Sequence, residues 1–176
     1  MKQADAPITG FVNEKGQEVD GEVDPARLAL LEDWLDADFD LGNHTYAHQS
    51  LHDIGVPAFQ QSILDGERQL RPLMAKRAKA PRWFRHPYLR TGTIAAGKQV
   101  IETFLGEHGY RVAPVTVDNS EWIYAAACRQ VLAIHLPEAE RDATLKRLRQ
   151  AYAPYMLNKL DYYERQPINL LGYALP

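Results

Sequence analysis

The chain has 176 residues, of which 45% are hydrophobic and 24% are charged. This balance is typical of a globular domain with a sizeable core, and the length favours one domain over residues 1–176. The formal net charge is −3 with acids and bases interspersed, which excludes the clustered basic surface of a nucleic-acid binder. No apolar run approaches the roughly 20 residues of a membrane span. The single cysteine, Cys128, allows no internal disulfide.

The first two thirds of the chain alternate short apolar runs with stretches of helical spacing. Three runs predict buried strands: residues 7–12, 39–42 and 82–85. Three stretches predict helices: residues 25–37, 59–74 and 94–108. Asp24 and Pro25 suit the start of the first helix, and Gly109 suits the end of the last. Gly66 and Pro72 are expected to bend or divide the middle one.

Residues 110–118 return to β-prone side chains and predict a further strand. The alternation of strands and helices favours an α/β domain built around a mainly parallel sheet. From about Leu136 the pattern changes to apolar residues at helical spacing, which predicts a long C-terminal helical region kinked at Pro154.

A histidine pair follows the second predicted strand. His44 and His48 are four residues apart, so a helical turn there would place both imidazoles on one face. Two converging imidazoles suit a zinc-like divalent ion, which takes three protein ligands in a catalytic site. His52 has the same spacing from His48, and a surface position is the simpler interpretation of it.

A second cluster, residues 83–88, ends the third predicted strand. Arg85 can hold a carboxylate bidentately, and Tyr88 offers a ring for a sugar face and a backbone N–H for an oxyanion. A buried Trp-Phe pair followed by a surface arginine is the plainer alternative.

A third cluster, residues 118–122, follows the next β-prone run. Asp118 could pair with Arg85, and Trp122 could line a groove. In the alternative interpretation, Asp118 or Ser120 caps a helix that begins near Glu121, and Trp122 packs in the core.

Taken together and in order, the three clusters resemble the polysaccharide deacetylases, the NodB-homology family also called carbohydrate esterase family 4. The stretch from His44 to His48 looks like that family's H-[ST]-x-x-H metal motif, and Arg85 to Tyr88 looks like its R-x-P-Y groove motif. Residues 118–122 look like a loose form of its Asp/Trp motif. The resemblance extends over nearly the whole chain from Pro7.

The resemblance implies an incomplete distorted (β/α) barrel and a metal, usually zinc, that activates water to remove an acetyl group from a glycan. His44 and His48 would be the metal ligands, and Arg85 would orient the catalytic base. The Tyr88 N–H would help to hold the oxyanion. The residues that would contact the glycan are Pro87, Tyr88, Asp118 and Trp122.

Two motifs of the family are missing from the sequence. The first is a strand that ends in two aspartates, the general base and the third metal ligand. The last is a Leu-x-His strand that supplies the general acid. We therefore expect a domain truncated at both ends and nearly inactive as it stands, because positioned proton transfers contribute ~10²–10⁴-fold each. The exposed edges of an incomplete sheet predict pairing between copies of the chain. The resemblance also implies that a full-length protein of this family would be exported to the cell envelope.

Two other interpretations stay open at this point. The chain could be a non-catalytic carbohydrate- or metal-binding module derived from the same fold. It could also be an α/β domain whose motif matches arise by chance, which side chains of His44 and His48 pointing apart would favour.

Overall fold

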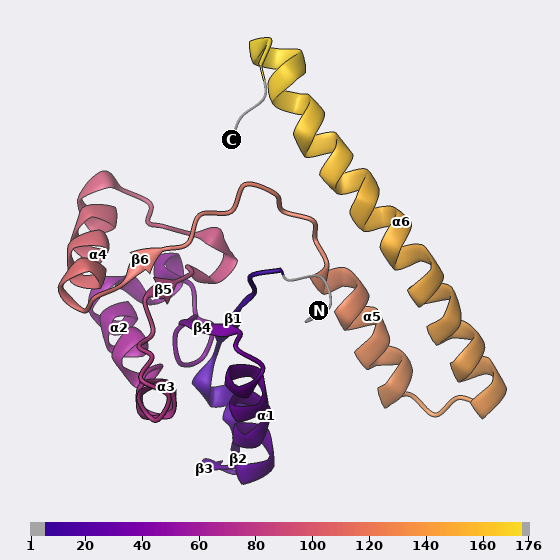
Figure 1. Ribbon diagram of the computed structural model, residues 1–176, viewed down its shortest axis with the longest axis horizontal. Coiled ribbons are helices and arrows are strands. Elements are labelled where there is room, and N and C mark those ends of the chain that lie inside the picture. The colour runs from indigo at the N-terminus through magenta and orange to yellow at the C-terminus, as the bar shows by residue number, and fades with distance from the viewer. Residues whose placement is uncertain (1–5, 174–176) are drawn as a thin grey trace. The chain divides into compact units, whose positions relative to one another are not determined.

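The computed structural model describes residues 6–173, which form two compact units (Figure 1). Of the described residues, the first unit comprises 6–114 and the second 115–173. The expectation that all 176 residues make one deacetylase-like domain stays a prediction.

The first unit is built on a four-stranded parallel sheet in the order β1-β4-β5-β6. Its strands are β1 (Thr9–Val12), β4 (Asp40–Asn43), β5 (Trp83–Phe84) and β6 (Arg111–Val112). The predicted α/β class with a parallel sheet is confirmed. Closure into a barrel stays a prediction, since β1 and β6 lie at opposite edges of this sheet.

Helices connect consecutive strands, as parallel pairing requires. The helical segments of this unit are η2 (Glu14–Gln17), α1 (Pro25–Asp36), α2 (Leu51–Asp65), α3 (Leu70–Ala75), η3 (Pro87–Leu89) and α4 (Ala95–Glu107). A small antiparallel hairpin, β2 (Glu18–Val19) and β3 (Glu22–Val23), precedes α1. The predicted cap of α1 is confirmed, because the Asp24 carboxylate accepts a hydrogen bond from the Ala26 N–H at 2.9 Å.

Two details of the sequence prediction are corrected. The expected division of the helix over residues 59–74 is confirmed at Gly66, between α2 and α3, but α2 begins earlier than predicted and contains a break at Gly55, where φ is +74°. The predicted strand over residues 110–118 keeps its ladder only at Arg111–Val112. Pro114 has no N–H to donate, so it cannot continue that ladder.

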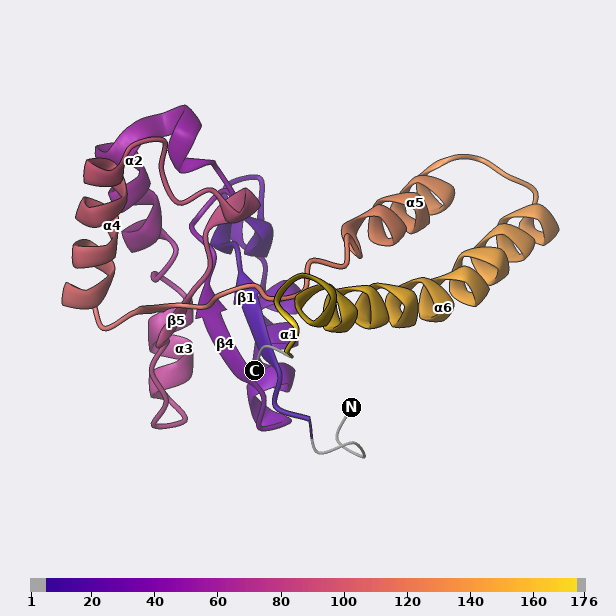
Figure 2. The ribbon, with the colours of Figure 1, turned by 90° about the horizontal axis from the view of Figure 1, so that it is seen from above.

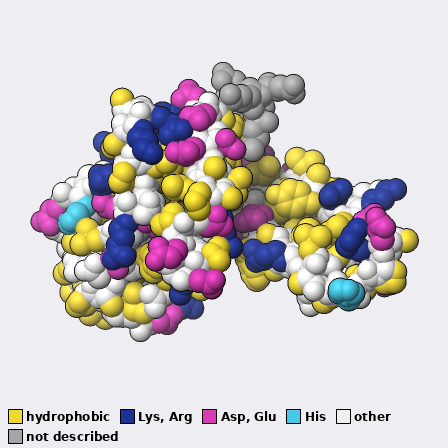
Figure 3. Space-filling model, turned by 90° about the horizontal axis from the view of Figure 1, so that it is seen from below, with side chains coloured by type: hydrophobic (Ala, Val, Ile, Leu, Met, Phe, Trp, Pro, Cys, Tyr) yellow, Lys and Arg dark blue, Asp and Glu magenta, His cyan; other side chains and the backbone are white. Residues whose placement is uncertain are grey.

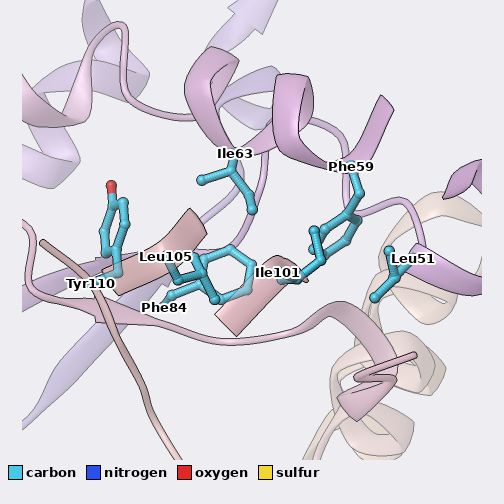
Figure 4. Packing of buried hydrophobic residues seen from close by; sticks show 7 residues of the cluster. All are labelled: Leu51, Phe59, Ile63, Phe84, Ile101, Leu105 and Tyr110. Atoms are coloured by element: carbon cyan, nitrogen blue, oxygen red, sulfur yellow. The ribbon is translucent and has the colours of Figure 1, made fainter. Parts of the chain in front are cut away.

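Two buried clusters hold the first unit together. One buries α2 and α4 against β5, and its side chains are shown in Figure 4: Leu51, Phe59, Ile63, Phe84, Ile101, Leu105 and Tyr110. The other buries α1 and α3 against β1 and β4 through Val12, Leu35, Leu41, Leu70, Leu73 and Met74. α2 and α4 lie side by side in both ribbon views (Figures 1 and 2).

The second unit is a helical hairpin of α5 (Trp122–Ala133) and α6 (Glu138–Leu171). The predicted long C-terminal helix is confirmed, and it continues through Pro154 and Pro167. Tyr124 of α5 contacts Tyr152 and Tyr155 of α6, with both ring centroids 5.3 Å away. Neither helix contains a buried residue, so this unit has little core of its own.

The surface carries charges of both signs. In the face shown in Figure 3, acidic and basic side chains are interspersed among hydrophobic ones. The described residues contain no helix that is long and apolar enough to cross a membrane.

A buried carboxylate ties η2 to α3 across 55 residues of sequence. Glu14 is buried, and its Oε1 accepts hydrogen bonds from the backbone N–H groups of Gln69 at 2.8 Å and Leu70 at 2.7 Å. Burial raises the pKa of the Glu14 carboxyl, which shows that desolvation outweighs these bonds in its titration. Glu14 thus caps the start of α3 from a distance.

Replacing Glu14 by alanine is expected to destabilise the chain by about 2–4 kcal/mol, because two donors at the start of α3 would lose their acceptor. Urea unfolding followed by circular dichroism measures this loss. Glu107→Ala, at the exposed end of α4, serves as the control and is expected to cost less than about 0.5 kcal/mol. Equal losses in the two variants would contradict the assigned role of Glu14.

Candidate functional site

The candidate site lies where two neighbouring parallel strands end. The loop after β4 begins with Asn43 and His44, and the loop after β5 begins with Arg85. The Arg85 N–H donates to the Asn43 carbonyl at 3.1 Å, which continues the β4-β5 ladder into the loops. The carboxyl ends of strands are the usual place for ligand sites in α/β sheets.

Three rings from these loops stack edge to face. The His44 and His48 ring centroids are 4.8 Å apart, and the His48 and Tyr88 centroids are 4.6 Å apart. The two histidines therefore point toward each other, which removes the main support for a chance motif match.

The histidines converge without a helical turn, so that part of the prediction was wrong. Residues 44–50 form no helix, and the backbone is left-handed at Thr45 (φ +66°) and His48 (φ +56°). Left-handed backbone is strained in residues other than glycine and is often found at functional sites. Two such residues fold the loop back so that position 48 returns to position 44.

The His44 ring is held in one orientation by the neighbouring loop. Its Nδ1 lies 2.7 Å from the Arg85 carbonyl oxygen, so Nδ1 carries the proton and Nε2 keeps its lone pair. Burial lowers the pKa of His44 to about 4. His44 is thus neutral at pH 7, as a metal ligand must be.

The other two histidines of the 44–52 stretch differ from each other. Burial lowers the pKa of His48, although this side chain is only partly buried. His52 is exposed, and its Nε2 accepts a hydrogen bond from the Gly92 N–H at 3.2 Å. That lone pair holds the loop after β5 and is not available to a metal.

Arg85 is a partly buried cation without an anionic partner among residues 6–173. Its guanidinium lies over the Phe11 ring, with Cζ 4.2 Å from the centroid, and its buried Nε has no hydrogen-bond partner. Burial lowers the pKa of Arg85. An unpaired guanidinium that loses hydration favours an incoming carboxylate or other anion.

Pro87 and Tyr88 shape the outer part of the site. Pro87 is buried at the start of η3, whereas the Tyr88 side chain is 61% exposed and has a left-handed backbone (φ +56°). The Tyr88 N–H makes no hydrogen bond within the described part of the chain. An exposed ring beside an unused N–H suits a face that meets a ligand.

Asp118 and Trp122, the two remaining predicted site residues, belong to the second unit. The Asp118 carboxylate accepts a hydrogen bond from the Ser120 N–H at 3.2 Å, and Trp122 is 63% exposed at the start of α5. Trp122 is therefore not a core residue. The expectation that these two residues line the same groove as Tyr88 stays a prediction.

Sequence reasoning overlooked three residues around the loops. The Asn13 side chain donates to the His44 and Thr45 carbonyls, and Asn43 bonds the Thr45 N–H. The Arg90 guanidinium lies 5.6 Å from the Tyr88 ring centroid. Asparagine at the end of a strand was a usable signal, because it commonly bonds the backbone two residues ahead.

The pair His44 and His48 fits two of the ligands of a zinc-like ion. Two imidazoles that share a tetrahedral zinc have centroids roughly 5 Å apart, close to the observed spacing. Within residues 6–173, no group of three His, Cys, Asp or Glu side chains is placed to hold a metal ion. The third ligand predicted from the resemblance is thus not supplied by the described residues.

Solved structures share this fold at low sequence identity. The chain is similar to a CE4 family pseudoenzyme from Bacillus anthracis, with 15% identity and a TM-score of 0.56 over 85% of this chain and 53% of that one. It is also similar to a family 4 carbohydrate esterase from Streptomyces lividans in complex with acetate, with 18% identity and a TM-score of 0.53 over 88% and 78%. The chain thus spans about half the length of the pseudoenzyme, and no curated protein matched it.

The family follows from the sequence match to a family model. The model of the polysaccharide deacetylases matches residues 1–113, which is more than half of the chain and includes both loops of the site. The chain belongs to the polysaccharide deacetylase family.

The buried histidines predict a loss of stability in acid. Burial lowers the pKa of His86 to about 4, as it does for His44, whereas an unfolded histidine titrates near 6.5. Between these values the unfolded chain binds more protons, so stability is full above pH 6.5 and falls as the pH drops toward 4. Each histidine contributes about 2 kcal/mol of this loss between pH 7.5 and 5.

Urea unfolding at pH 7.5 and pH 5 in the presence of a chelator tests this expectation. His86→Phe keeps a ring against Phe59, on which the imidazole stacks at 5.8 Å, and should reduce the pH dependence by about half. His135→Gln changes an exposed histidine and is the control. An undiminished pH dependence in His86→Phe would refute this account.

Proposed function

We propose that this chain carries part of the active site of a metal-dependent hydrolase that removes N- or O-acetyl groups from a polysaccharide. The observation that supports this most directly is the convergence of His44 and His48 at 4.8 Å, with the first imidazole neutral and its Nδ1 occupied by the Arg85 carbonyl. Membership of the polysaccharide deacetylase family supplies the reaction class.

In this proposal His44 and His48 would hold a divalent ion, with zinc preferred because both ligands are imidazoles. A bound zinc supplies a nucleophile at neutral pH by lowering the pKa of its water to roughly 7, and it polarises the acetyl carbonyl. The Arg85 carbonyl keeps the proton on Nδ1 of His44, which leaves Nε2 for the ion.

The loop after β5 would contact the acetylated sugar. The exposed Tyr88 ring offers a face for the sugar, and the unused Tyr88 N–H would donate to the oxygen that becomes negative during attack. Arg85 would receive the carboxylate of the general base, because its guanidinium has no anionic partner among residues 6–173. Pro87, buried beside Tyr88, would shape this face, and glycan contacts of Asp118 and Trp122 stay a prediction from the resemblance.

We expect little turnover from this chain alone. No third His, Cys, Asp or Glu joins the pair to hold an ion within the described residues. Two ligands bind zinc more weakly than three, so both zinc occupancy and turnover should be low.

A non-catalytic carbohydrate- or metal-binding module derived from the same fold is the alternative. The fold itself is compatible with either outcome, since its solved relatives include both a pseudoenzyme and an esterase. Zinc-dependent acetate release from an N-acetylated or O-acetylated glycan separates the two. Glycan binding without acetate release would support the module.

Zinc affinity tests the metal assignment. His44→Ala and His48→Ala are each expected to weaken zinc binding by about 100-fold or more, because either change leaves a single imidazole. His52→Ala is the matched control and should change the affinity by less than about threefold, since its Nε2 bonds the Gly92 N–H. Competition with a chromogenic chelator measures all three. Unchanged affinity in His44→Ala would place the metal elsewhere.

Arg85→Ala separates metal binding from the handling of the substrate. The bond to His44 comes from the Arg85 backbone carbonyl and survives the substitution, so zinc affinity should stay within about threefold. Zinc-dependent acetate release should fall by about 10²-fold or more in this variant, because the carboxylate of the base would lose its cation. Loss of zinc in Arg85→Ala would show that the guanidinium has a structural role.

A further inference from the structure

Asn43 is the last residue of β4 and is fully buried beside the histidine pair. Its side chain makes three hydrogen bonds. Oδ1 accepts from the Thr45 N–H at 2.7 Å, and Nδ2 donates to the Ile63 carbonyl at 2.9 Å and to the Tyr110 phenol oxygen at 3.1 Å. Both ends of the amide are therefore used, which fixes its orientation.

The bond to Thr45 stabilises an unfavourable backbone. Thr45 is β-branched and fully buried, yet its φ is +66°, a conformation that such residues rarely adopt. The side-chain Oδ1 of Asn43 accepts a hydrogen bond from the N–H two residues ahead, which closes a turn around His44. This turn sends the chain back toward the imidazole of His44.

The end of α2 presses against the same turn. A Cβ added at Gly66 would lie 2.9 Å from the Thr45 carbonyl carbon and 3.0 Å from the Asn43 Oδ1. The Tyr46 N–H donates to the Ser62 carbonyl at 2.9 Å. The backbone turn at Thr45 is therefore held by the Asn43 side chain and packed against the end of α2, which leaves little space for a different backbone conformation.

Tyr110 links the Asn43 side chain to the start of β6. It precedes β6, it is buried, and its ring lies 6.2 Å from the Phe84 ring, centroid to centroid. Its phenol oxygen accepts from Asn43, so one amide joins the end of β4, the end of α2 and the start of β6. Nothing else among the described residues bonds the Thr45 N–H.

We infer that Asn43 is a positioning residue, which holds the left-handed turn at Thr45 and thereby brings His48 against His44. The effect of Asn43 on metal binding rests on the proposed function, since a shared metal ion would need His44 and His48 at this spacing. Asn43 touches neither a metal ion nor a substrate and acts through the Thr45 N–H.

Three variants of the full chain separate positioning from general stability. Asn43→Ala loses the acceptor for Thr45 together with both donors. Asn43→Asp loses both donors but keeps an oxygen for the Thr45 N–H. Ile101→Ala deletes buried side chain from the α2/α4 cluster, far from the loop in sequence, and lowers stability without touching the turn. Where Asn43→Ala does not fold, Asn43→Leu replaces it, because it keeps the volume and lacks the acceptor.

The first readout needs no metal. The measurement is the nuclear Overhauser contact between the His44 and His48 rings in chelator-treated protein. This contact should be present in the unchanged chain, in Asn43→Asp and in Ile101→Ala. It should be lost in Asn43→Ala. The second readout is zinc affinity, expected to fall about 10-fold or more in Asn43→Ala and less than about threefold in the other two.

Several outcomes would overturn the inference. One is an intact ring contact and an unchanged zinc affinity in Asn43→Ala. Another is an equal loss of ring contact in Asn43→Asp, which would show that the Thr45 bond is not the cause. A loss of contact in Ile101→Ala would reduce the role of Asn43 to stability. If the unchanged chain binds no zinc, the proposed function fails, while the ring contact still decides whether Asn43 positions the pair.

Discussion

The hydrogen bonds that join the ends of β4 and β5 are the constraint on which the candidate site depends. The Arg85 N–H bonds the Asn43 carbonyl, and the Arg85 carbonyl bonds the His44 ring. Both contacts exist because the two strands are parallel neighbours that end at the same edge of the sheet. Arg85 thus aligns the ends of the two strands through its N–H. Through its carbonyl it determines that Nδ1, and not Nε2, carries the proton of His44.

Several energetically unfavourable features lie close to the ends of β4 and β5. Thr45, His48 and Tyr88 have left-handed backbone, and the guanidinium of Arg85 has no anionic partner within residues 6–173. The two buried clusters of the first unit can absorb such costs, since they pack helices against β1, β4 and β5. Strain and an unpaired charge gathered at one sheet edge, next to a converging imidazole pair, are typical of a site that meets a ligand.

The second unit differs in its physical character. α6 has 34 residues, about 51 Å at 1.5 Å per residue, whereas α5 has 12. Neither helix buries a residue, and the family match ends at residue 113. The residues proposed to bind the metal, His44 and His48, therefore lie in the first unit, whereas Asp118 and Trp122 lie in the second.

Local patterns in the sequence determined the element types and the pair of loops that carry the site. Apolar spacing and the Asp24-Pro25 cap predicted α1, and the order of the histidine and Arg85–Tyr88 motifs predicted the family. Tertiary structure decided the rest. The histidine spacing suggested a helical turn, but the Asn43 amide and the close approach of Gly66 impose a left-handed turn instead. His52 has the same spacing from His48 as His48 has from His44, but it is exposed and its Nε2 bonds the N–H of Gly92, 40 residues away. Such choices depend on contacts between distant segments, which residue spacing along the chain does not encode.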